Sequence, residues 1–118
     1  MIKRKIWVTF SMNGIHCYPD APEEVKYLRD LHRHKFNFKV TIEVFHDDRE
    51  IEFHLFQNWI ISLYNSGVIS FDYKSCEMLA SELIDAICIK YPNREIEVEV
   101  SEDGECGASL VYEPEIEV

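Results

Sequence analysis

The stretch from residue 34 to residue 45 constrains the fold of this chain most, because its side chains alternate strictly in character. The apolar side chains share one side: Phe36, Phe38, Val40, Ile42 and Val44. Polar or charged residues occupy the positions between them. Successive side chains of a β-strand point to opposite faces of a sheet. This period of two predicts a strand with one face in the core.

Other segments repeat one of two patterns, an alternation or a helical spacing. Further strands are expected at residues 3–12, 96–100 and 108–113, with a short one at residues 50–53. Helices are expected at residues 55–65 and 76–91, and a short helical stretch at residues 23–31. The main order is strand, strand, helix, helix, strand, strand, with no parallel crossover. It predicts an α+β fold, a four-stranded antiparallel sheet with two helices on one face.

Length and charge limit the classes of protein that fit. The 118 residues suit one domain, and we expect its last part, residues 113–118, to be an acidic frayed tail. A net charge of −10 argues against a nucleic-acid polymer as partner. No apolar run approaches the roughly 20 residues of a membrane span, and the first ten residues lack a signal-peptide core. We therefore expect a cytoplasmic protein, with its four cysteines as free thiols.

Three histidines form the sharpest candidate site. His32 and His34 are two residues apart on a predicted strand, so both imidazoles point to the same side. His16 follows the first strand with matching parity and is the natural third ligand. Three such ligands suit zinc and leave one position open for water or substrate. The alternative is that these are ordinary histidines that form common hydrogen bonds.

Glu102 is the second candidate. It continues the inward-facing series of Ile96, Val98 and Val100, so its carboxylate is expected to point toward the core side of the sheet. A carboxylate there needs partners, and two N–H donors on the edge of a guanidine-like heterocycle would satisfy it. The alternative is that the strand has already ended and Glu102 is solvated.

Several motifs in this order resemble the 6-pyruvoyl-tetrahydropterin synthase family, which includes 6-carboxy-tetrahydropterin synthase and has the T-fold. The likeness covers nearly the whole chain. The segment 31–36 (LHRHKF) resembles the family's L-H-G-H-N-Y motif, and 50–53 (EIEF) its strand before the first helix. The segment 75–80 (SCEMLA) resembles the start of its second helix, and 98–102 (VEVSE) the strand that ends in its glutamate.

The resemblance implies a set of roles for this chain. It makes His16, His32 and His34 the zinc ligands and Glu102 the anchor of the pterin ring. It also implies a homo-oligomer, a hexamer built from trimers, or a trimer. It implies a small heterocyclic molecule as the binding partner.

The chain departs from the family's pattern where catalysis is concerned. Leu28 stands where the family carries a catalytic cysteine, and residues 64–74 lack the family's L-D-H motif. The glycine inside the histidine motif is replaced by Arg33, which adds a positive charge. Cys17 is expected to face away from the metal, whereas Cys106 follows Glu102 closely and is the one candidate for a replacement catalytic group.

Three functions remain open at this point. The first is a binding protein for a purine- or pterin-type molecule, with Arg33, Arg29 or Lys35 near an anionic group if the ligand is phosphorylated. The second is a zinc-dependent pterin-forming lyase with rearranged catalytic residues. The third is an interaction module that uses the T-fold to oligomerise. Metal analysis separates the third from the others, and turnover separates the second from the first.

Overall fold

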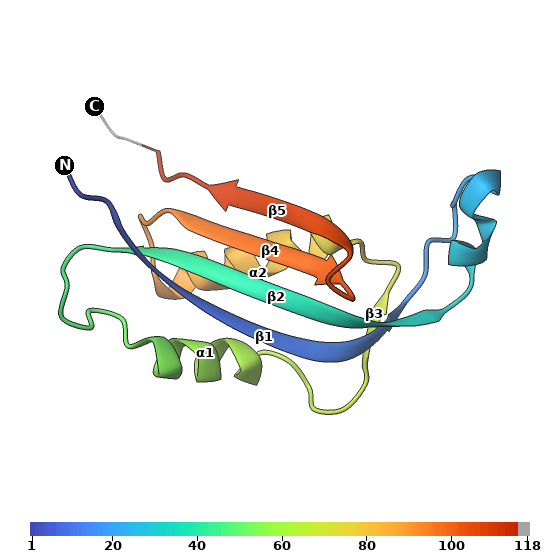
Figure 1. Ribbon diagram of the computed structural model, residues 1–118, viewed down its shortest axis with the longest axis horizontal. Coiled ribbons are helices and arrows are strands. Elements are labelled where there is room, and N and C mark those ends of the chain that lie inside the picture. Colours follow the sequence, from blue (N-terminus) through green and yellow to red (C-terminus); the bar gives the residue numbers. More distant parts are fainter. Residues whose placement is uncertain (116–118) are drawn as a thin grey trace.

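The computed structural model describes residues 1–115, which form a sheet with two α-helices packed beside it (Figure 1). The strands are β1 (Arg4–His16), β2 (His32–Val44), β3 (Ile69–Asp72), β4 (Ile96–Glu102) and β5 (Cys106–Tyr112). The helices are α1 (Phe53–Ser62), α2 (Cys76–Lys90) and a 3-10 helix, η1 (Glu23–Arg29). The predicted α+β class is confirmed, and both predicted α-helices are present with no end shifted by more than three residues.

The sheet has the strand order β3-β1-β2-β4-β5. The four longer strands pair antiparallel, as predicted, with β1 against β2, β2 against β4 and β4 against β5. The fifth strand, β3, was not predicted, and it pairs parallel to the end of β1, with Gly14 opposite Ile69. Its four residues are too few for alternation to be recognised, and its partner lies more than fifty residues earlier in the chain.

The strand predicted at residues 50–53 is absent from the described chain, because its side chains have other partners. The carboxylate of Glu50 accepts a hydrogen bond from the backbone N–H of Phe45, at 2.6 Å, and forms an ion pair with Arg94. These two interactions hold the pKa of Glu50 below its usual value. The carboxylate of Glu52 accepts from the N–H of His54, at 2.7 Å, and so caps the start of α1.

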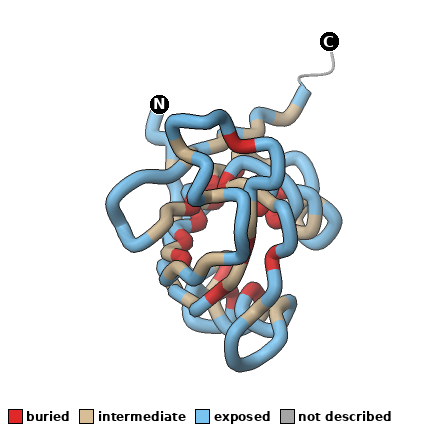
Figure 2. The backbone as a smooth tube through the Cα atoms, turned by 90° about the vertical axis from the view of Figure 1, so that its right-hand side faces the viewer, coloured by how far each residue is buried: buried red, intermediate tan, exposed pale blue. Residues whose placement is uncertain are grey.

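A single core fills the space between the sheet and the two α-helices. The strand side chains at Phe36, Phe38, Val40 and Ile42 are at most 1% exposed. They meet buried helix residues, among them Phe56, Ile60, Leu79, Leu83 and Ile87. Figure 2 shows the buried positions gathered in the interior of the molecule. The inward parity of β2 therefore sets which side of the sheet carries the core.

The predicted tail, residues 113–118, lies partly outside the described residues. Residues 113–115 follow β5 without regular secondary structure, and residues 116–118 lie outside the described residues. No helix in residues 1–115 has the length and apolar character that a membrane crossing requires.

Candidate metal centre

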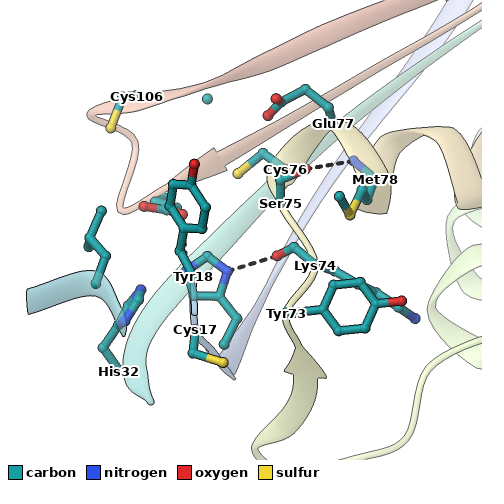
Figure 3. Close-up of a pocket in the computed structure, with 14 residues that line it drawn as sticks. Cys17, Tyr18, His32, Tyr73, Lys74, Ser75, Cys76, Glu77, Met78 and Cys106 are labelled. Carbon is teal, nitrogen blue, oxygen red and sulfur yellow. Dashed lines mark hydrogen bonds and ion pairs between the residues drawn. The ribbon is translucent and has the colours of Figure 1, made fainter. Parts of the chain in front are cut away.

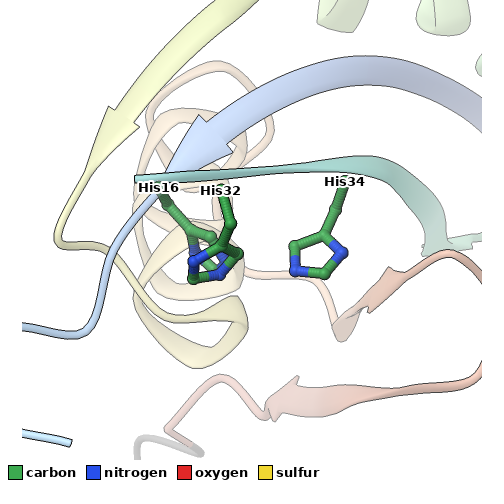
Figure 4. A group of neighbouring side chains, drawn as sticks. All are labelled: His16, His32 and His34. Carbon is green, nitrogen blue, oxygen red and sulfur yellow. The ribbon is translucent and has the colours of Figure 1, made fainter. Parts of the chain in front are cut away.

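Three histidines converge where β1 ends and β2 begins. His16 is the last residue of β1 and pairs directly with His32, the first residue of β2. His34 lies two residues further along β2, on the same side of the strand. One ring nitrogen from each residue lies within 4.8 Å of the others, and the three rings point to the same side of the sheet (Figure 4). This group could hold a metal ion.

The Nδ1 atom of each histidine already has a hydrogen-bond partner. The Nδ1 atoms of His16 and His32 each lie 2.9 Å from a backbone carbonyl oxygen, that of Lys74 and that of Asp30. The Nδ1 atom of His34 lies 2.7 Å from the carboxylate of Asp103. Because these oxygens accept hydrogen bonds, Nδ1 carries the proton whenever the ring is neutral. The Nε2 lone pairs remain free for a metal, the arrangement found around metal-bound histidines.

Asp103 is itself held in place by the turn after β4. One carboxylate oxygen of Asp103 accepts the backbone N–H of Lys35 at 2.9 Å, and the other faces the ring of His34. These two hydrogen bonds, the backbone one first, keep the pKa of Asp103 below its usual value. An ionised Asp103 fixes both the tautomer and the orientation of His34.

The Nε2 atoms have no ordinary partner. Those of His16 and His34 are buried and form no hydrogen bond with any residue in the range 1–115. They lie 3.1 Å and 3.4 Å from the two carboxylate oxygens of Glu102. Imidazole lone pairs that face a carboxylate repel it, and a cation between them removes the repulsion. Three imidazoles beside one carboxylate therefore fit a divalent transition metal.

Phe36 supports the histidines from below. Its ring is fully buried and lies 5.1 Å from the ring of His16 and 5.9 Å from that of His34, measured between centroids. Gly14 leaves room for this ring, because a Cβ atom there would approach Phe71 to 2.5 Å and Phe36 to 2.8 Å. The orientation of His16 and His34 thus depends on packing against the ring of Phe36.

A cavity of about 490 Å³ opens beside the histidines. His16, His32 and Glu102 line it from the ends of three strands, and residues 75–78 line it from the start of α2. Figure 3 shows His32 together with residues 75–78 around this cavity. Leu28 also lines it, so an apolar wall stands where the resemblance expects a catalytic cysteine. Glu102 is the last residue of β4, its side chain is 25% exposed, and its carboxylate faces the histidines.

Three thiols line the same cavity. Cys106, the candidate catalytic residue, is exposed at its rim, and Cys17 also lines it, although the sequence predicted that Cys17 faces away from the metal. Sequence reasoning missed Cys76, which is buried directly after the N-cap Ser75 of α2. Burial, with the nearby carboxylates as smaller causes, raises the pKa of Cys76 to about 12. Its position at the first residue of a predicted helix was the one available signal.

Arg33 lies apart from this cavity. It is exposed, and its place between His32 and His34 puts its side chain on the opposite face of β2. It is not among the described residues that line the cavity. The alternation that aligns the two histidines therefore also separates Arg33 from them.

No family model matches the sequence, and no curated protein matches it. Several solved structures match the fold. The 6-pyruvoyl tetrahydropterin synthase of Plasmodium falciparum has 14% identity and a TM-score of 0.67, over 94% of this chain and 98% of that one. The synthase of Plasmodium vivax has 14% identity and a TM-score of 0.66, and the match covers 96% of this chain and 99% of that one. A Plasmodium vivax variant, in which a catalytic glutamate is replaced by alanine, has 14% identity and a TM-score of 0.67, with the same coverage of 96% and 99%. These matches show that the chain has the T-fold of the pterin synthases.

Proposed function

We propose that this T-fold protein holds zinc at His16, His32 and His34 and binds a purine- or pterin-type heterocycle beside it through Glu102. One observation carries the proposal: three clustered imidazoles, two of them with buried Nε2 atoms that form no hydrogen bond, meet one carboxylate at the edge of a cavity of about 490 Å³. The volume lies within the range of small-molecule pockets. The similarity to pterin synthase structures supports the class of ligand.

The residues around the metal would have separate tasks. The three histidines would be its ligands, and the carbonyls of Lys74 and Asp30 would hold two of the rings in place. Three protein ligands leave one zinc position open, and zinc in such a site polarises a ligand oxygen. Glu102 would accept two parallel N–H bonds from the heterocycle, a pairing that fixes orientation as well as adding energy.

Proton transfer is the part of the synthase reaction that this chain does not support. Leu28 offers no proton, and Cys76 stays a neutral thiol because its pKa is about 12. The segment 64–74 contains an aspartate but no histidine. General acid–base catalysis needs a positioned group whose pKa lies near the working pH. The proposal is therefore a binding protein rather than a pterin synthase.

A lyase with rearranged residues is the second candidate, because three thiols line the cavity. Cys106 would then be its catalytic group, since it is the exposed one of the three beside Glu102. An interaction module without a ligand is a weaker candidate, because it leaves the free Nε2 atoms of the histidines unexplained.

Replacing Glu102 by Gln is expected to weaken binding of the heterocycle about tenfold or more, because an amide offers one acceptor oxygen in place of two. Calorimetry with the zinc-loaded protein, titrated with pterins and guanine derivatives, measures the difference. Zinc content is expected to stay at the wild-type level. Equal affinities of wild type and variant would contradict the anchor role, and loss of zinc would make Glu102 a metal ligand instead.

A steady-state assay with dihydroneopterin triphosphate completes this test. Turnover is expected to be lower than that of a pterin synthase by a factor of about 100 or more, because one positioned acid or base contributes that much. Synthase-like turnover that is abolished by Cys106→Ala would reject the binding protein and establish the lyase.

We also propose a homo-oligomer, a trimer or a hexamer. Within residues 1–115, β3 pairs with β1 only from Gly14 to His16, so no strand pairs with the edge of β1 from Arg4 to Asn13 or with the outer edge of β5. The side chain of Gln57 on α1 occupies one acceptor of the β1 edge, the carbonyl of Thr9. Open edges favour pairing with another chain, and two different edges that join head to tail close into a ring. Analytical ultracentrifugation at micromolar concentration is expected to give a trimer or larger; a monomer would contradict it.

A further inference from the structure

We infer that the heterocycle held in the cavity carries no phosphate group. This inference rests on the proposed heterocycle site and narrows its ligand to an uncharged or cationic molecule. The charges that one chain places around the cavity support it, because two carboxylates line the ligand space and each nearby Lys or Arg among the described residues is paired or lies on the opposite face of β2.

The lining of the cavity is acidic. Glu102 contributes a carboxylate from the sheet and Glu77 another from the first turn of α2. Lys74 is the one Lys or Arg among the described residues that line the cavity. Its ammonium lies 3.0 Å and 3.2 Å from the two carboxylate oxygens of Glu82, so its charge is already balanced. No described lining residue therefore offers a free cation to a phosphate.

The other basic residues of this region are not among the described residues that line the cavity. Arg29 donates from Nε to the carbonyl of Ala21 at 2.9 Å and lies 3.5 Å from the carboxylate of Glu23. Arg33 and Lys35 share the opposite face of β2 and are both exposed. Of the three cations that could have held a phosphorylated ligand, Arg29 is thus engaged with other partners, and Arg33 and Lys35 lie on the face of β2 away from the histidines.

The N-terminus of α2 is a feature near the cavity that could attract anions, but nearby groups already offset its partial positive charge. Helix N-termini carry a partial positive charge and free N–H groups. The hydroxyl of Ser75 accepts the N–H of Met78 at 3.2 Å, and the carboxylate of Glu77 lies in the same turn. The carboxylate of Glu77 would repel a phosphate at this helix end.

The loaded site would have no surplus positive charge before any ligand arrives. Three carboxylates, Glu77, Glu102 and Asp103, offset the two charges of a divalent ion held by the histidines. A phosphate monoester adds about 1.5 to 2 negative charges at pH 7. The whole chain also carries a net charge of −10. Phosphorylation of the ligand is therefore expected to weaken binding, and a triphosphate is expected to weaken it more than a monophosphate.

Calorimetry with matched probes tests this inference. The zinc-loaded protein is titrated with 7,8-dihydroneopterin and its triphosphate, and with guanosine, its monophosphate and its triphosphate. Within a series that binds, the unphosphorylated compound is expected to bind about tenfold or more tightly than the triphosphate, by a factor that shrinks as salt is added. Equal or tighter binding of the phosphorylated compounds would overturn the inference while leaving the heterocycle site intact. Binding of no compound in either series would overturn the site itself.

Charge variants identify the cause. Glu77→Gln removes a carboxylate from the lining, and Glu82→Gln frees the ammonium of Lys74. Both are expected to narrow the affinity gap between the phosphorylated and unphosphorylated compounds severalfold. Glu99→Gln is the matched control, because Glu99 is exposed on the opposite face of β4 and the gap should not change. A gap that stays the same in both test variants would contradict the electrostatic explanation.

Discussion

Protein purified without chelator is expected to contain about one zinc ion per chain, and simultaneous replacement of His16, His32 and His34 by Ala should reduce this to near zero. Two buried Nε2 atoms that lack a hydrogen bond are the reason, because a metal is the partner that satisfies both. Elemental analysis after gel filtration measures the change. Full zinc occupancy in the triple variant would reject the site.

Asp103→Asn gives a graded version of this test. Asp103 accepts from Nδ1 of His34, and loss of such an outer partner lowers metal affinity about 10- to 100-fold. His54→Ala is the matched control, because the side chain of His54, in the first turn of α1, is 76% exposed and lies outside the cluster. Zinc content should not change in the control, and an unchanged affinity in the Asp103 variant would contradict the supporting role.

Acidification should also release the metal, because protons and metal compete for the same nitrogen atoms. An imidazole binds a metal ion only in its neutral form, so binding becomes weaker when the ring is protonated. The affinity for zinc is therefore expected to fall as the solution is made more acidic.

Phe36→Ala is expected to lower the free energy of unfolding by about 3–5 kcal/mol, the usual loss when a buried phenylalanine is truncated. Phe36 is fully buried and packs against Phe71, with 5.0 Å between ring centroids. Urea unfolding at a fixed protein concentration and with chelator present measures this loss without the contribution of the metal.

Two further measurements separate packing from other causes. Phe53→Ala is the control, because Phe53 is 49% exposed at the start of α1 and should lose about 1 kcal/mol or less. The zinc affinity of the folded Phe36 variant should also fall, since the rings of His16 and His34 lose their packing against the Phe36 ring. A loss of stability below about 1 kcal/mol for Phe36→Ala would contradict the packing described above.

Sequence patterns predicted the long strands correctly because alternation is a local property. The side of β2 that carries Phe36, Phe38 and Val40 follows from period two alone, whatever strand lies beside it. The same parity put His32 and His34 on one side and Arg33 on the other. The predictions for the short segments were wrong because their structure depends on distant residues. Residues 50–53 alternate, but Glu50 forms an ion pair with Arg94, and β3 forms because it pairs with the end of β1.

The candidate site divides in the same way. The residue types, their spacing and the inward parity of Glu102 were readable from the sequence alone, because they depend on neighbours in the chain. The orientation of the imidazole rings could not be predicted from the sequence, because the hydrogen-bond partners of His16 and His34 lie 58 and 69 residues away in the chain. Cys76 and Leu28, and the pairing of Lys74 with Glu82, likewise met the cavity only through packing. Sequence determined which groups were available, whereas the register of the sheet and the meeting of distant loops decided which atoms face one another.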